Sequence, residues 1–267
     1  MFTVLIIAAF IPVLLIFFCE LSGSLLAAWF WTGTGVDFPC LPLLRLTAGI
    51  LICMLAVKMQ EHFFSCKLRL FQLKGCFKAF LLILPVTLSA AFINLLNLAG
   101  KSFSLTFPAD FFSCFFQAAY PALLEETAFR GLIIPLLIKK WGRLRHYKFF
   151  TVTVCAGIFG LFHLFNLRNG TSLSSVILQV CYAACIGCVF AAVFLRTRSL
   201  AGGILSHTLI NFTAYLNGTV TTALESSPAA VIITLLLCSG CLLWTAFLLK
   251  KDHREAIDPL WSDLRSF

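Results

Sequence analysis

A pair of adjacent glutamates inside a long apolar segment constrains this chain more than any other feature of its sequence. Glu125 and Glu126 belong to the stretch LLEETAFRG, within an apolar run over residues 111–138 that is long enough to cross a bilayer. Each charge at the centre of a bilayer costs at least ~2.5 kcal/mol, and Arg130 adds a third charge to the same segment. Such a cluster indicates side chains that pair with one another or face a hydrated cavity.

Helical spacing assigns different roles to the two glutamates. Glu126 and Arg130 are four residues apart, so they share one helix face and can form an ion pair. Glu125 points about 100° away from Glu126, so it faces another element. We therefore predict that Glu125 is the working group and that the other two residues support it.

The composition is that of a membrane protein. Of the 267 residues, 60% are hydrophobic and 12% are charged, whereas soluble domains contain about 25% charged residues. We predict an all-α fold, a polytopic transmembrane helical bundle with about eight spans that forms a single domain over residues 1–267. The tail, residues 250–267, is expected to be a short amphipathic or disordered cytoplasmic end. The predicted apolar segments are 2–30, 41–57, 77–99, 111–138, 149–165, 173–195, 199–216 and 229–249.

The net charge of +9 follows the gaps between these segments. Basic residues gather in residues 58–74, 139–148 and 196–198 and at the start of the tail, and the intervening gaps contain few of them. This alternation is the positive-inside pattern, so it predicts that both termini are cytoplasmic. The chain has no basic, aromatic-rich soluble module for nucleic acid and no glycine-rich phosphate loop for a nucleotide.

The twelve cysteines lie mostly inside apolar segments, where cysteine behaves as a small hydrophobic residue. Cys181, Cys185 and Cys188 share a helix face, and Cys238 and Cys241 form a CxxC pair. Because histidines and charged partners are lacking nearby, we interpret both groups as helix-packing residues rather than as metal or redox sites.

Two other apolar segments carry polar residues at a similar depth. His163 follows Phe159 by four residues in FGLFH, and Asn211 follows His207 by four in HTLIN, so each pair presents one helix face. At about 1.5 Å per residue, the groups from the three segments lie within about two helical turns of one level. We interpret this agreement as convergence on one active site, although each group alone would indicate only a hydrogen bond between helices.

This combination favours hydrolysis by activated water. HExxH, an aspartate inside a span and a serine nucleophile elbow are all absent. Glu125 is suited to act as a general base with His163, and His207 and Asn211 could donate hydrogen bonds to an oxyanion. Glu125, His163 and His207 could instead form a zinc site of two histidines and one carboxylate, and the sequence leaves both options open.

The three motifs, in this order, resemble the CPBP family, which includes the CAAX prenyl proteases and the bacteriocin-processing (Abi) proteins. They are EExxxR at residues 125–130, FxxxH at 159–163 and HxxxN at 207–211. The resemblance covers residues 111–216, the predicted catalytic core. It implies an intramembrane endopeptidase, and the compact chain looks more like a bacterial member, located in the inner membrane.

The resemblance also implies a role for each matching residue. Glu125 and His163 would activate water, while His207 and Asn211 would form the oxyanion site. The family has been described both as metalloproteases and as glutamate-type proteases, so zinc stays an open question. The catalytic residues implied are Glu125, His163, His207 and Asn211, supported by Glu126, Arg130 and Phe159.

The expected partners are the lipid bilayer and a membrane protein or peptide that serves as substrate. One alternative is a membrane immunity or scaffold protein that keeps the fold without catalysis, and the intact motifs argue against it. A second is a proton-coupled transporter that uses Glu125 and Glu126. The absence of an internal repeat weakens this alternative, because many transporters show one.

Overall fold

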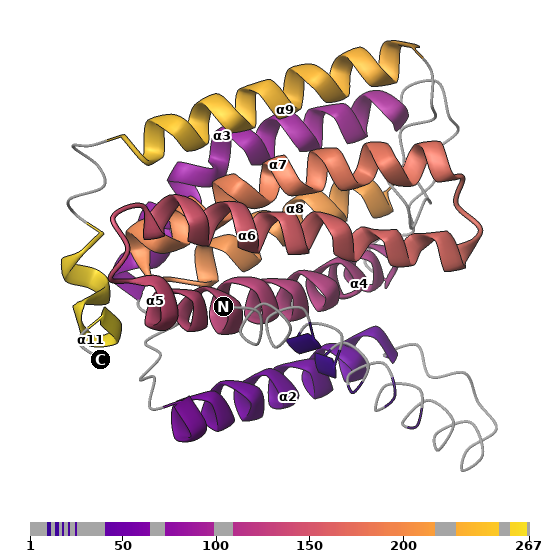
Figure 1. Ribbon diagram of the computed structural model, residues 1–267. Helices are drawn as coiled ribbons and strands as arrows, with labels where there is room; N and C mark the ends of the chain where they lie inside the picture. Colours follow the sequence, from indigo (N-terminus) through magenta and orange to yellow (C-terminus); the bar gives the residue numbers. More distant parts are fainter. Residues whose placement is uncertain are drawn as a thin grey trace.

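The computed structural model describes residues 41–64, 73–98, 109–216, 228–250 and 257–265, with isolated positions between 10 and 25. All regular structure in these residues is helical, which confirms the predicted all-α class (Figure 1). The first predicted segment, 2–30, lies almost entirely outside them. The elements are α2 (Leu41–Phe64), α3 (Leu73–Leu98), α4 (Ala109–Glu125), η1 (Glu126–Ile133), α5 (Ile134–Trp141), α6 (Tyr147–Phe162), η2 (His163–Asn169), α7 (Leu173–Thr197), α8 (Ala201–Tyr215), α9 (Pro228–Leu248), η3 (Pro259–Trp261) and α11 (Ser262–Arg265).

Five helices in the described part of the chain are long and apolar enough to cross a membrane. The predicted segments 111–138 and 199–216 are also helical, but neither forms a single long α-helix. The run α4–η1–α5 changes helix type in its middle, and α8 has only 15 residues. The five spans are Pro42–His62, Gly75–Leu95, Tyr147–Arg168, Leu173–Thr197 and Val231–Leu248.

Helix α7 is the centre of the bundle. It packs against α6, α9 and α3 (Figure 1). Residues Val189 to Leu195 are buried on every side of the helix, which is typical of a helix enclosed by others. Helix α8 lies between α3 and α4, and α2 packs against α4 at the edge of the bundle.

Helix α8 approaches its neighbours through paired glycines. A Cβ on Gly202 would lie 2.6 Å from the Cys76 carbonyl oxygen and 2.6 Å from the Ala79 Cβ of α3. A Cβ on Gly203 would lie 3.2 Å from Oε2 of Glu126. The two glycines therefore let α8 reach both α3 and the acidic motif.

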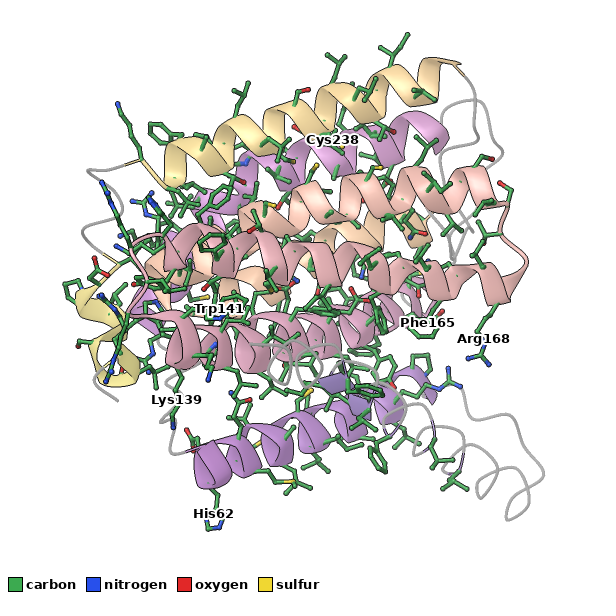
Figure 2. All side chains as sticks on the ribbon, in the orientation of Figure 1. His62, Lys139, Trp141, Phe165, Arg168 and Cys238 are labelled. Atoms are coloured by element: carbon green, nitrogen blue, oxygen red, sulfur yellow. The ribbon has the colours of Figure 1, made fainter. Side chains whose placement is uncertain are left out.

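The C-terminal segment packs against one end of the bundle. Of the two expected alternatives, a disordered tail is therefore wrong for residues 257–265, which form a short end with apolar side chains buried and Ser262 and Asp263 exposed. Ile257, Trp261 and Leu264 are buried there, and the Trp261 indole donates a hydrogen bond to the Leu195 carbonyl oxygen at 2.8 Å. Figure 2 shows Lys139 at this end of the bundle and Arg168 at the opposite end.

Helix α2 also differs from prediction, because it continues to Phe64 instead of ending near residue 57. Lys58 and Glu61, three residues apart, form an ion pair at 3.0 Å that supports the extra turns. None of the described cysteines forms a disulfide. The thiols of Cys185 on α7 and Cys238 on α9, the latter labelled in Figure 2, are in hydrogen-bonding contact.

Candidate active site

The acidic motif lies at the point where α4 changes into a π-helix. Glu125 is the last residue of α4 and Glu126 is the first of η1, whereas the sequence predicts one continuous helix over 111–138. Side chains of neighbouring helices bind the backbone of this segment. The Gln60 amide donates to the Leu132 carbonyl oxygen at 3.0 Å, and the Cys155 thiol donates to the Phe129 carbonyl oxygen at 3.2 Å. Such insertions disturb a regular helix ladder, and π-turns are frequent at functional sites.

Glu126 and Arg130 form the predicted ion pair. Nη1 of Arg130 donates to Oε1 of Glu126 at 3.0 Å, and both side chains are at most 2% exposed. Nη2 donates to the Gly187 carbonyl oxygen at 3.3 Å. The guanidinium carbon lies 4.4 Å from the ring centroid of Phe159 and 5.4 Å from that of Phe190, which are cation–π distances. Arg130 is therefore held through both terminal nitrogens and between two aromatic rings, whereas its buried Nε has no hydrogen-bond partner among the described residues.

His207 joins the two glutamates. Its Nδ1 lies 3.0 Å from Oε1 of Glu126, and its Nε2 lies 3.7 Å from Oε2 of Glu125. Because a carboxylate only accepts hydrogen bonds, Nδ1 carries the proton in this contact. Glu126 thus orients His207 as well as neutralising Arg130, a contact that the sequence did not reveal.

His163 ends α6 and begins the short 3₁₀-helix η2. Its Nδ1 lies 3.0 Å from the Phe159 carbonyl oxygen, so Nδ1 donates and Nε2 is left to accept a hydrogen bond. The Phe159 ring meets the rings of His163 and His207 edge-on, at centroid distances of 5.0 and 6.1 Å. Phe159 connects the two histidines, whereas His163 makes no hydrogen bond or ion pair with either glutamate in the described part of the chain.

Asn211 binds the backbone of α4. Its amide donates to the Ala118 carbonyl oxygen at 3.4 Å, a long hydrogen bond. Asn94 of α3 donates to the Ile210 carbonyl oxygen at 3.0 Å on the other side of the same helix. Helix α8 is therefore fixed from both sides near the site.

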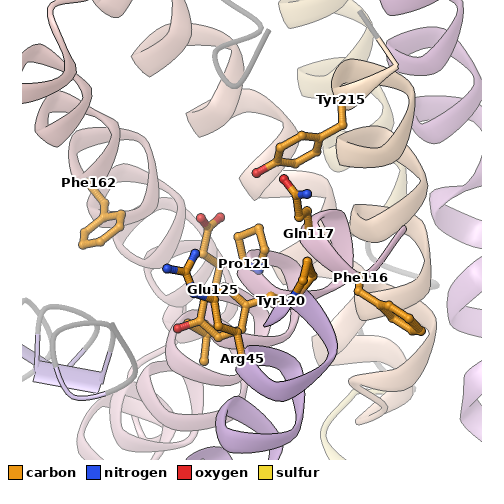
Figure 3. Close-up of a pocket in the computed structure, with 10 residues that line it drawn as sticks. Arg45, Phe116, Gln117, Tyr120, Pro121, Glu125, Phe162 and Tyr215 are labelled. Atoms are coloured by element: carbon orange, nitrogen blue, oxygen red, sulfur yellow. The ribbon is translucent and has the colours of Figure 1, made fainter. Parts of the chain in front are cut away.

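Glu125 lines a cavity of about 390 Å³ (Figure 3). Its side chain is 16% exposed, compared with 2% for Glu126. Arg45 of α2 extends into the same cavity, although no motif includes it and its only sequence signal is a charge inside an apolar segment. The cavity is lined by Pro42, Arg45, Phe116, Gln117, Tyr120, Pro121, Leu124, Glu125, Phe162 and Tyr215.

Residues 105–213 match the family model described as type II CAAX prenyl endopeptidase, Rce1-like. The chain carries an Rce1-like region. All three motifs lie within it, so the predicted CPBP relationship is confirmed for this part of the chain, which is less than half of its length. This similarity, together with the apolar helices, indicates an integral membrane protein in which residues 105–213 resemble CAAX-type endopeptidases.

Comparisons with curated proteins and with solved structures gave no match. The assignment therefore rests on the Rce1-like region alone. Helices α2, α3 and α9 lie outside this region. Arg45 of α2 nevertheless lines the cavity beside Glu125.

The zinc ligands suggested by sequence do not converge in the Rce1-like region. Glu125 and His207 approach one another, but no three His, Cys, Asp or Glu side chains among the described residues are arranged to hold a metal ion. His163 instead hydrogen-bonds the Phe159 carbonyl oxygen and contacts the Phe159 ring. We therefore derive no chemical step through zinc.

Proposed function

We propose that this chain is an intramembrane endopeptidase that hydrolyses a peptide bond in a membrane-associated protein or peptide. The observation that carries the proposal is the different placement of the two glutamates. Glu126 is bound by Arg130 and His207, whereas Glu125 reaches a cavity that can admit water and substrate. A carboxylate in such a place is suited to act as a general base.

In the proposed reaction, Glu125 removes a proton from water while the water oxygen bonds to the substrate carbonyl carbon. Nε2 of His163 accepts a second hydrogen bond from the water and orients it. The carbon–nitrogen bond then breaks, and Glu125 returns its proton to the leaving nitrogen. The products are a new carboxyl group and a new amine.

His207 and Asn211 are proposed to stabilise the oxyanion of the tetrahedral intermediate. Donation by His207 requires a proton on Nε2 in addition to the Nδ1 proton held by Glu126. Because Glu126 already balances Arg130, the oxyanion itself supplies the charge that balances the imidazolium. The Asn211 amide would exchange its long hydrogen bond to α4 for one to the oxyanion.

The test is cleavage by the purified full-length protein of two fluorescence-quenched peptides, one carrying a prenylated cysteine and the other its unprenylated counterpart. We expect Glu125→Gln and His163→Ala each to slow cleavage by about 10²–10⁴-fold, the usual contribution of general acid–base catalysis. Glu61→Gln makes the same change at a partly buried glutamate of α2 that belongs to no motif, and it should leave the rate unchanged. Unaltered cleavage by both site variants would refute the proposal and favour a scaffold role.

Metal dependence is tested in the same preparation. If water is activated directly by the side chains, cleavage survives a zinc chelator, and the purified protein contains no stoichiometric zinc. Stoichiometric zinc that is lost in both Glu125→Gln and His163→Ala would instead make those residues metal ligands.

We further propose that the protein lies in a bacterial inner membrane with both termini in the cytoplasm. Basic residues of 139–148 and 196–198 and the C-terminal segment share one end of the bundle, which supports this orientation. A fluorescent protein fused to the C-terminus should then fluoresce, and alkaline phosphatase at the same position should be inactive.

A further inference from the structure

The cavity beside Glu125 contains a positive charge that the proposed water activation does not use. Arg45 projects into it from the second turn of α2 (Figure 3). Its buried Nε has no hydrogen-bond partner, and no acidic side chain among the described residues forms an ion pair with its guanidinium. Arg45 lies near the end of its span, where an arginine can extend toward the interface, but it lines the cavity instead, so it is expected to meet an anionic group there.

The surroundings of Arg45 are suited to a peptide. Phe116, Pro121, Leu124 and Phe162 provide apolar walls, and Gln117 and Tyr215 provide polar groups near Glu125 (Figure 3). The volume of about 390 Å³ is within the ~300–1,000 Å³ range of small-ligand pockets. The cavity therefore fits a short extended segment rather than a folded domain.

We propose that Arg45 determines substrate specificity by binding a carboxylate of the peptide whose scissile bond lies beside Glu125. The planar guanidinium can bind both oxygens of a carboxylate at once, in a geometry that an ammonium group does not reproduce. The charge of Arg45 also offsets the repulsion between a substrate carboxylate and Glu125. This inference rests on the proposed peptidase function.

The carboxylate could belong to the C-terminus of the peptide or to an acidic side chain near the scissile bond. Three fluorescent peptides of the same apolar sequence distinguish these sources: a free acid, its C-terminal amide, and an amide with one Asp before the end. The experiment measures the Kd with which each fluorescent peptide binds the full-length protein in phosphatidylcholine nanodiscs.

We expect the wild-type protein to bind at least one carboxylate peptide about ten- to a hundredfold more tightly than the plain amide, because a hydrogen bond to a charged group contributes ~1.5–3 kcal/mol. Arg45→Gln should abolish this difference, and Arg45→Lys should keep part of it. Arg143→Gln removes an exposed arginine from the α5–α6 connection and should behave as wild type.

Equal Kd values for all three peptides in the wild-type protein would overturn the proposal, as would a preference that persists in Arg45→Gln. A third outcome would also overturn the proposal: the three peptides bind with equal Kd, the wild-type protein binds phosphatidylglycerol, and Arg45→Gln abolishes the lipid binding. Arg45 would then bind a lipid phosphate. Arg45→Glu gives a gain-of-function test: this variant should prefer a peptide that ends in a cationic aminoethyl amide.

The kinetic readout separates this inference from the proposed function. With a cleaved carboxylate substrate, Arg45→Gln should raise KM about ten- to a hundredfold and change kcat little, because the contact is made equally in the ground state and the transition state. If Glu125→Gln leaves cleavage unchanged while the binding preference persists, the peptidase assignment fails and the carboxylate site stands. If cleavage depends on Glu125 but the protein does not prefer carboxylate peptides over the plain amide, only the proposed role of Arg45 is refuted.

Discussion

At the scale of single residues, the two adjacent glutamates differ in environment rather than in chemistry. Glu126 contacts Arg130 and His207 and is almost completely buried, whereas Glu125 faces the cavity. A buried ion pair contributes to stability only while both partners are present. Replacing Glu126 should therefore affect folding and the position of His207, and replacing Glu125 should affect the reaction itself.

Glu126→Gln should destabilise the protein by about 3–5 kcal/mol, because it leaves the fully buried Arg130 without its balancing charge. Glu61→Gln removes a partner from the ion pair with Lys58, whose side chain is 76% exposed, and should cost less than about 1 kcal/mol. Thermal unfolding of both variants in the same detergent, followed by tryptophan fluorescence, measures the difference. Equal decreases in Tm for Glu126→Gln and Glu61→Gln would contradict the burial of the Glu126–Arg130 ion pair.

At the scale of helices, the position of α8 decides whether His207 can reach the glutamates. Its paired glycines permit the approach to α3 and η1, and the hydrogen bonds of Asn94 and Asn211 fix it from two sides. The geometry of the site therefore depends on close packing at residues that have no chemical role.

Gly202→Ala should destabilise the protein by about 1–3 kcal/mol, because its Cβ would meet the backbone of α3 at Cys76. Gly240→Ala in α9 is the matched control, since a Cβ there meets nothing within 4 Å. The control should stabilise α9 by up to ~1 kcal/mol through helix propensity. Chemical or thermal unfolding in detergent checks both values, and a stable Gly202→Ala variant would contradict the close packing.

The helices themselves could be predicted because a bilayer requires backbone hydrogen bonds to be satisfied within each segment. The ion pair of Glu126 and Arg130 could be predicted because four-residue spacing places both on one helix face. The π-helix could not, since it depends on bonds from distant residues such as Gln60 and Cys155. The contact of His207 with Glu126 likewise depends on the rotation of α8, which its own sequence does not specify.

At the scale of the whole molecule, the C-terminal segment joins three helix ends that are far apart in sequence. Arg198, which ends α7 with a positive φ of 51°, binds both carboxylate oxygens of Asp263 at 2.9 and 2.8 Å and stacks on Trp261. Asp258 accepts hydrogen bonds from Tyr147 at 2.8 Å and from Lys148 at 2.6 Å. Arg265 donates to the Gly142 carbonyl oxygen at 2.9 Å, directly after α5. The segment thereby fixes the end of α5, the start of α6 and the end of α7, and α6 carries the Phe159–His163 motif.

The Asp258 contacts predict a pH dependence of stability. Burial raises the pKa of this carboxyl, but hydrogen bonds from Lys148 and Tyr147 outweigh burial and leave the pKa below its ordinary value of 3.8. The stabilisation is therefore present above about pH 4, where the unfolded carboxyl is also ionised, and is lost as the pH falls through the lowered pKa. Asp258→Asn should lower Tm more at pH 6 than at pH 3, because the stabilisation begins to be lost below the ordinary pKa. An equal loss of Tm at both pH values would show that charge is not the cause.

Trp261→Ala should detach the C-terminal segment while leaving the cavity intact. Trp261 is completely buried, and replacing a buried tryptophan by alanine typically costs about 3–5 kcal/mol. Leu243→Ala on α9 is the control, because that side chain is 73% exposed and its loss should change stability by less than about 0.5 kcal/mol. Hydrogen–deuterium exchange should rise in residues 257–265 and at the end of α7 that binds them, and exchange around Glu125 should stay unchanged. Because the cavity lies near the other ends of these helices, Trp261→Ala should preserve peptide affinity. Faster exchange around the cavity in this variant would instead show that the C-terminal segment supports the site itself.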